Sequence, residues 1–66
     1  MQAYVALLEE GTSCWRPISV EVVEQDRYRI TSQEPDGENW EFKSGSIVRL
    51  VEKEFSDGNG LLAVSI

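Results

Sequence analysis

The sequence predicts an all-β domain in which five or six short antiparallel strands close into a small barrel. Two observations favour this fold class. Apolar and polar side chains alternate with a period of two along most of the chain, as in strands that have one buried face. Turn-forming residues interrupt this alternation at short intervals, and no segment has the apolar spacing of a helix.

The length of the chain favours a single closed unit. Its 66 residues form at most one domain, 1–66. A chain of this size buries only about 60% of the surface that it exposes when unfolded. We therefore expect one small barrel with a well-filled core rather than two stacked sheets.

Six ranges are predicted to be strands: 2–9, 15–24, 27–31, 39–43, 47–55 and 61–66. Pro17 has no N–H to donate, so its end of the second strand should lie at an edge or outside the ladder. The terminal "LLAVSI" would be an aggregation-prone edge on its own. We expect it to pair with "YVALL" near the start of the chain, which would close the barrel.

Turn residues separate these ranges, in "EEGTSC", "EQD", "SQEPDGE" and "SDGNG". In the third of them, Pro35 fixes φ and Gly37 accepts a positive φ, which is typical of a tight turn.

Alternation also predicts which side chains face inward. Trp40 is expected in the core beside Phe42, whereas the pattern leaves open whether Trp15 is exposed. The predicted core consists of Val5, Leu7, Ile18, Val20, Val22, Tyr28, Ile30, Trp40, Phe42, Val48, Leu50, Leu62 and Val64.

The residue inventory argues against an enzyme. Cys14 is the only cysteine, and the chain has no histidine. An internal disulfide and a Cys/His metal site are therefore ruled out. A nucleophilic Cys14 would lack a histidine to deprotonate it. We expect no catalytic residues, no metal site and no cofactor.

Charge and hydropathy restrict location and partners. Twelve acids against six bases give a formal net charge of −6, which disfavours binding to a phosphate backbone. No stretch approaches the roughly 18 to 20 apolar residues of a membrane span. The first apolar run stops at Leu8 without a basic region before it. We expect an acidic cytoplasmic protein that does not enter a membrane.

The order of these features resembles a known fold family. A strand, an acidic-Gly turn, "CWRP", alternating valines and then "DRYRI" resemble the layout of Tudor-like and other SH3-like small barrels. The likeness runs from residue 4 to about residue 50 and includes "WEFKSGSIV". More narrowly, the layout is similar to that of small bacterial proteins with no assigned activity. The resemblance implies an SH3-like barrel, and Trp15, with Tyr28 as a weaker candidate, stands where Tudor-like domains carry an aromatic cage.

These observations favour a non-enzymatic interaction module that binds another protein or a peptide. The fold commonly binds peptides between loops, and an aromatic residue here lies next to a proline-bearing edge. The expected docking surface lies near the first hairpin and the loop 35–38, with the candidate residues Tyr4, Trp15, Arg16, Pro17, Asp36 and Glu38.

Two alternatives remain open at this stage. The net charge itself suits an acidic inhibitor or accessory subunit bound to a basic partner. A nucleic-acid-binding barrel, which the charge disfavours, would need a coherent basic face built from Arg16, Arg27, Arg29 and Arg49.

Overall fold

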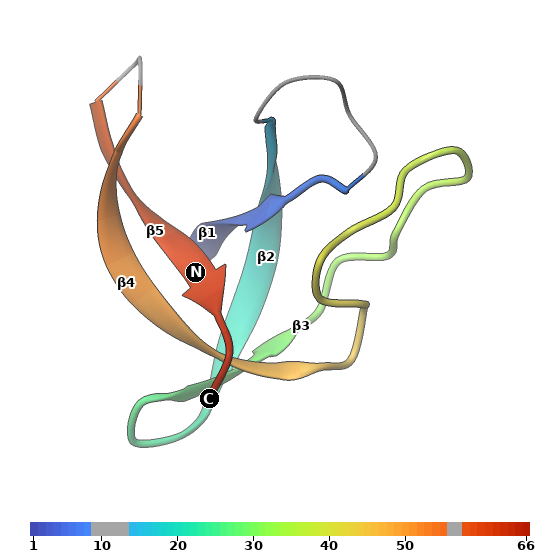
Figure 1. Ribbon diagram of the computed structural model, residues 1–66. Coiled ribbons are helices and arrows are strands. Elements are labelled where there is room, and N and C mark those ends of the chain that lie inside the picture. The colour runs from blue at the N-terminus through green and yellow to red at the C-terminus, as the bar shows by residue number, and fades with distance from the viewer. Residues whose placement is uncertain (9–13, 56–57) are drawn as a thin grey trace.

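The computed structural model describes residues 1–8, 14–55 and 58–66. Within these ranges the chain forms strands and no helix (Figure 1). The strands are β1 (Gln2–Ala6), β2 (Trp15–Glu24), β3 (Arg27–Ile30), β4 (Ile47–Phe55) and β5 (Gly58–Val64). None of the described segments forms a helix capable of crossing a bilayer.

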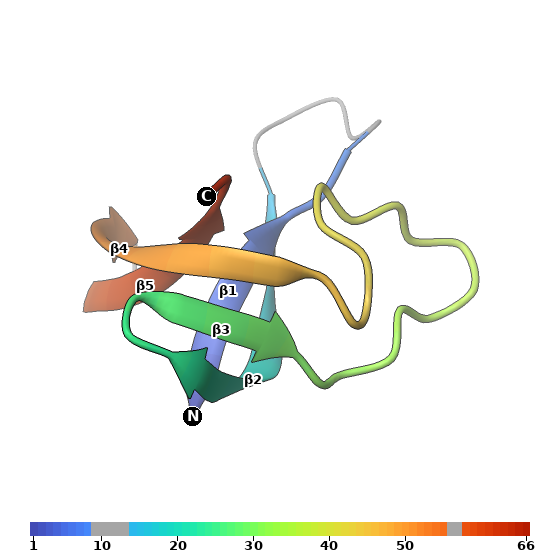
Figure 2. The same cartoon turned by 90° about the horizontal axis from the view of Figure 1, so that it is seen from below.

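The five strands form one closed sheet in the order β1-β2-β3-β4-β5 (Figures 1 and 2). Each strand is antiparallel to the next one along the chain. β5 then returns to β1 and pairs with it in parallel at Tyr4 and Leu62. The predicted all-β class and the pairing of the two ends are confirmed. The prediction of antiparallel pairing is wrong for the closing contact, because both terminal strands run in the same direction.

The range 39–43 is not a strand, contrary to the prediction. It belongs to the long connection 31–46, which extends to one side of the sheet between β3 and β4 (Figure 1). Trp40 makes only an isolated bridge to Leu7. The Leu8 N–H donates to the Asn39 carbonyl (2.7 Å), and the Glu41 N–H donates to the Ala6 carbonyl (2.9 Å). These two hydrogen bonds make up the bridge, and they fix this segment beside the end of β1.

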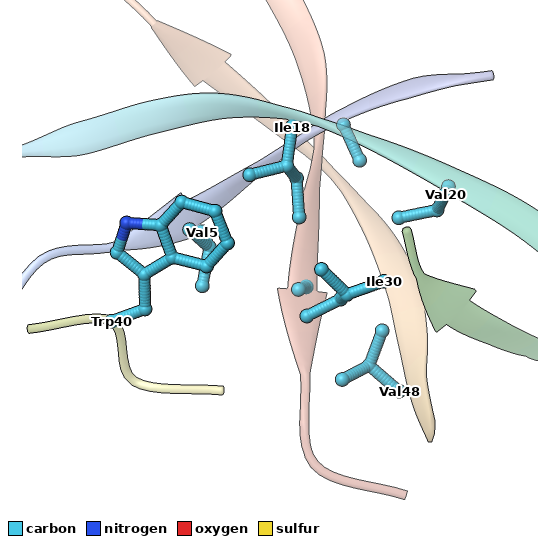
Figure 3. Close-up of a cluster of buried hydrophobic side chains, with 8 residues drawn as sticks. Val5, Ile18, Val20, Ile30, Trp40 and Val48 are labelled. Atoms are coloured by element: carbon cyan, nitrogen blue, oxygen red, sulfur yellow. The ribbon is translucent and has the colours of Figure 1, made fainter. Parts of the chain in front are cut away.

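The core lies inside the closed sheet and draws on every strand (Figure 3). Trp40, the largest fully buried side chain, enters it from the connection 31–46 and is only 2% exposed. Its indole nitrogen lies on the side away from the aliphatic cluster (Figure 3). The buried residues are Ala3, Val5, Ile18, Val20, Ile30, Trp40, Val48 and Ala63. Partly buried side chains pack around them: Leu7, Tyr28, Phe42, Leu50 and Leu61.

Three predicted core positions are wrong. Val22 is 65% exposed, because β2 continues past the core, although Val22 still pairs in register with Tyr28 of β3. Leu62 and Val64 are only partly buried and lie on the outward side of β5. Ala63 faces the core instead, because it pairs with the inward-facing Leu50 of β4.

Pro17 lies in the middle of the pairing between β1 and β2, opposite Tyr4. The N–H of Val20 donates to the Met1 carbonyl, and the N–H of Leu7 donates to the Cys14 carbonyl. Hydrogen-bonded pairs alternate in an antiparallel ladder, so the pair of Tyr4 and Pro17 is a non-hydrogen-bonded one. The proline nitrogen points away from β1, on the side where β3 pairs only from Val20 onward. The predicted edge position is confirmed.

Two predicted turns are confirmed. Gln25 and Asp26 connect β2 to β3, and Asp26 has a φ of 60°. The Glu38 N–H donates to the Pro35 carbonyl (3.3 Å), and Gly37 adopts a φ of 88°.

The predicted turn in "EEGTSC" falls largely on residues 9–13, and the first two residues of "SDGNG" are 56–57; both ranges lie outside the described residues. The other three residues of "SDGNG" are not a turn, contrary to the prediction, but the start of β5, where Gly58 pairs with Phe55 and Gly60 with Lys53.

A matched pair of substitutions tests where the core ends along β2. Val20→Ala removes two buried methyl groups and should lower the free energy of unfolding by about 2 kcal/mol. Val22→Ala, two positions further on, should change it by no more than about 0.5 kcal/mol, because that side chain is exposed. Urea unfolding followed by tryptophan fluorescence measures both values. Equal losses from the two variants would contradict this placement of the core.

Candidate docking surface

Three aromatic side chains from three strands meet on the outside of the sheet. The rings of Tyr4 on β1 and Phe55 on β4 lie 4.5 Å apart between centroids, tilted by 36°. The Trp15 ring on β2 meets Phe55 edge to face at 5.4 Å. All three residues are half-buried. We call Tyr4, Trp15 and Phe55 the aromatic cluster.

The alternation of side chains along each strand explains why these rings face outward. On β1, Ala3 and Val5 point into the core, so Tyr4 between them points away from it. Tyr4 pairs with Leu62 of β5, and β5 in turn pairs with β4, which carries Phe55. The cluster therefore lies across β5, at the place where the sheet closes.

Gly60 provides the space in which two of these rings meet. A Cβ atom at this position would lie 2.9 Å from Tyr4 Cε1 and 3.0 Å from Phe55 Cε2. Contacts of this length are shorter than van der Waals separation, so a side chain here would force the rings to move. The rings of Tyr4 and Phe55 thus lie directly over the backbone of β5.

Lys53 places a cation over the cluster. Its Nζ lies 5.0 Å from the Trp15 ring centroid and 5.8 Å from that of Phe55. A cation within about 6 Å of an aromatic face is attracted by the ring quadrupole. Lys53 and Phe55 are two positions apart on β4, so both point to the same side of the strand.

A separate polar network surrounds the buried Trp40. Its Nε1–H donates to Glu38 Oε1 at 2.8 Å. Arg16 donates to both oxygens of the same carboxylate, from Nε to Oε1 (3.1 Å) and from Nη2 to Oε2. Glu38 therefore ties the connection 31–46 to β2 and satisfies the indole N–H at the rim of the core.

Glu34 holds the other side of the same segment. Its Oε2 accepts the backbone N–H of Trp40 (3.1 Å) and the Nζ of Lys43 (3.0 Å). The pKa of Glu34 is lowered from 4.5, first by the Trp40 N–H and then by Lys43. The pKa of Glu38 is likewise lowered from 4.5, first by the Arg16 hydrogen bond and then by the Trp40 indole. Both carboxylates are ionised where they bind Trp40.

The structure places five of the six predicted site residues in two separate groups. Tyr4 and Trp15 belong to the aromatic cluster, and Pro17 lies opposite Tyr4 on the same outward side. Arg16 and Glu38 form an ion pair in the network around Trp40. Asp36 is exposed in the turn after Pro35 and belongs to neither group. A single surface made of all six residues is therefore not what the fold provides.

Sequence reasoning missed Phe55, Lys53 and Gly60. Alternation in β4 already indicates that Lys53 and Phe55 share one side, but the sequence does not show which strand lies beside them. Trp40 was assigned to the core correctly, but its hydrogen bond to Glu38 was missed.

The proposed basic face does not form as one unpaired set of arginines. Arg16 is bound by Glu38 and Arg29 by Glu21, the latter through an N–O contact of 2.8 Å. Among the residues that the structure describes, no group of three or more Cys, Asp or Glu side chains is placed to hold a metal ion. What the outward side offers chemically is aromatic surface with a cation beside it.

Comparisons with known proteins add no relative: no family model, no curated protein and no solved structure matches the chain.

The lowered carboxylate pKa values predict an acid-sensitive connection. A pKa that is lower in the folded state gives stability that is complete above pH 4.5 and is lost as the pH falls through the lowered pKa. Glu38→Gln should therefore be less stable than the wild type at about pH 7, with the difference shrinking towards about pH 3. Urea unfolding across this range measures the difference.

Glu52→Gln serves as the control, because Glu52 is exposed on β4 and makes no ion pair among the described residues. A gap between wild type and Glu38→Gln that stays constant down to the lowest pH would contradict the role given to Glu38.

Proposed function

We propose that this protein is a non-enzymatic interaction module of the SH3-like barrel class, which binds another protein through the aromatic cluster. One observation carries the proposal: β1, β2 and β4 bring Tyr4, Trp15 and Phe55 into contact on the outward side of the sheet. Large aromatic side chains dominate the binding energy of many protein interfaces. The site therefore has the composition of a docking surface.

The burial of the two tryptophans supports this proposal. In so small a domain, the simplest use of a large aromatic side chain is to fill the core. Trp40 does so, at 2% exposure. Trp15 instead packs against Phe55 outside the sheet and stays half-buried. The core does not require Trp15, which leaves its surface for a partner.

The fold class and the location are parts of the same proposal. Five short strands closed through their two ends are consistent with an SH3-like barrel, and the sequence likeness from residue 4 to about residue 50 supports that class. A lone cysteine suits a reducing compartment, which favours the cytoplasm.

Replacement of Trp15 tests the proposal. Trp15→Ala should weaken binding to the native partner by about 30-fold or more, because loss of a central aromatic anchor typically costs about 2 kcal/mol or more. The partner is captured from the host with the wild type, and its affinity is then measured by calorimetry. Val22→Ala, which shortens an exposed apolar residue away from the cluster, should bind as the wild type does.

The dependence of the binding affinity on salt concentration distinguishes this proposal from the alternative of an acidic subunit that binds a basic partner. A complex formed through the aromatic cluster should persist at an ionic strength of about 1 M, where the Debye length is only about 3 Å, and only the part of its affinity that comes from ion pairs should fall. Circular dichroism confirms that each variant is folded. Unchanged affinity of Trp15→Ala, or a complex that high salt dissolves in the wild type, would overturn the proposed function.

A further inference from the structure

One part of the outward side of the sheet differs in charge from the rest of the chain. It comprises the even residues of β1 and β5, the odd residues of β4 and the odd residues of 15–19 in β2. These positions carry apolar, aromatic, amide, hydroxyl or basic side chains and no carboxylate. Twelve of the 66 residues are acidic, so a face without any of them is a marked local departure. We call this surface the outward face. Next to it, the outward side of the sheet continues with the ion pair of Glu21 on β2 and Arg29 on β3, and with Arg27 on β3.

The only charges on the outward face are Arg49 and Lys53 of β4. Three other basic residues of the chain are neutralised by carboxylates: Arg16 by Glu38, Arg29 by Glu21, and Lys43 by Glu34. Arg49 and Lys53 form no ion pair within the described residues. Lys53 lies over two aromatic rings, and Arg49 Nε donates to the Ser65 carbonyl at 3.3 Å.

The acids of β4 point to the other side of the strand. Glu52 pairs across the sheet with Leu61, and Glu54 pairs with Asn59, whereas Lys53 pairs with Gly60 on the outward face. The alternation of β4 thus separates its own charges, with cations and Phe55 on one side and carboxylates on the other. Among the described residues, Lys53 over the aromatic cluster and Arg49 further along the same side of β4 have no carboxylate within ion-pair distance.

We propose that the outward face binds a peptide segment of another protein that combines apolar or aromatic side chains with one or two carboxylates. This inference rests on the proposed function and adds the chemistry of the partner. The apolar side chains cover the aromatic cluster, and the carboxylates pair with Lys53 and Arg49. Charge complementarity at the face carries the argument.

The spacing of the cations gives the segment a pattern. Arg49 and Lys53 are four positions apart on β4, so their side chains leave the strand about 13 Å apart. Val51, which is 40% exposed, lies between them. A partner segment that lies extended along β4 would fit this spacing if it carried two carboxylates four positions apart. An apolar residue halfway between them would then contact Val51.

Other occupants fit the charges less well. A basic segment would place like charges beside Arg49 and Lys53. A nucleic acid would meet the two cations, but its long phosphate chain would also meet a protein of net charge −6. A short segment with few carboxylates avoids both difficulties, because repulsion beyond about 8 to 10 Å is screened at physiological salt.

Selection from a display library of random peptides tests the inference without a known partner. The immobilised wild-type protein should enrich peptides that contain Asp or Glu together with aromatic or large aliphatic residues. Affinities of synthetic copies are then measured by fluorescence anisotropy. Lys53→Glu and Arg49→Glu should each lower the affinity for the selected acidic peptides by about tenfold or more. Arg49→Glu is included because Arg49 does not contact the rings, whereas Lys53→Glu also removes the cation above Trp15.

The double variant Gln33→Glu, Ser44→Glu is the matched control, since it lowers the net charge by the same two units at exposed positions of the connection 31–46, which extends to one side of the sheet (Figure 1). It should bind the selected peptides within about twofold of the wild type. Enrichment of basic peptides, or equal binding by the wild type and Arg49→Glu, would overturn the inference. So would binding of an oligothymidylate probe that both reversals abolish, or self-association of the protein that they disrupt.

Trp15→Ala separates the inference from the proposed function. If the selected peptides are basic but lose affinity for Trp15→Ala, the partner chemistry is wrong and the docking surface stands. If the library yields no binders, or yields binders with the same affinity for Trp15→Ala as for the wild type, the proposed function fails together with the inference.

Discussion

The contact between β1 and β5 is the constraint on which the rest of the structure depends. It joins the two ends of the described chain at Tyr4 and Leu62 and turns a five-stranded sheet into a closed one. Closure buries Ala3, Val5 and Ala63 on its inner side. On its outer side it brings Tyr4 to Phe55 across β5. The same pairing therefore completes the core and creates the aromatic cluster.

This closure depends on a small residue in β5. A glycine inside a strand usually destabilises it, since glycine loses more conformational freedom on folding than other residues. Here Gly60 lets the rings of Tyr4 and Phe55 lie directly over the strand, where a Cβ atom would meet them at 2.9 and 3.0 Å. The cost in backbone entropy is offset by ring contacts that bridge β1 and β4.

Trp40 fills the core from a connection rather than from a strand. It is fixed by Glu34 at its backbone N–H and by Glu38 at its indole N–H. Two carboxylates at the rim of the core thereby hold a segment that has no strand of its own. The network also binds Arg16, which alternation along β2 places on the opposite side of the strand from Trp15 and Pro17.

Much of the fold was predictable from alternation and turn chemistry. The strand ranges 15–24 and 47–55 agree with β2 and β4, and the turn at Pro35–Glu38 follows from the properties of proline and glycine. Position 40 was assigned to the core correctly, but its neighbourhood was taken for a strand. Alternation of Trp40 and Phe42 fits a strand as well as a short segment that is pinned by one bridge.

The register of β5 and the composition of the cluster were not predictable in the same way. The segment "LLAVSI" contains no polar residue before Ser65, so its sequence does not show which side chains face outward. Leu62 and Val64 were therefore predicted to lie in the core, whereas Ala63 is the buried residue. Trp15 and Phe55 are 40 positions apart in the sequence, and only the pairing of β1 with β5 brings them together. The alternation of apolar and polar residues within a strand does not show which strand lies beside it. It indicates only that the apolar segment "LLAVSI" must be covered by some other part of the chain.

The most direct test of this account is a two-dimensional nuclear Overhauser spectrum of the wild-type protein in solution. Closure across β5 predicts cross-peaks from the Tyr4 ring protons to the α-protons of Gly60 and to the Phe55 ring. If β2, β3 and β4 show their expected cross-strand peaks while Tyr4 shows none to Gly60 or Phe55, the sheet is open, and the aromatic cluster does not exist.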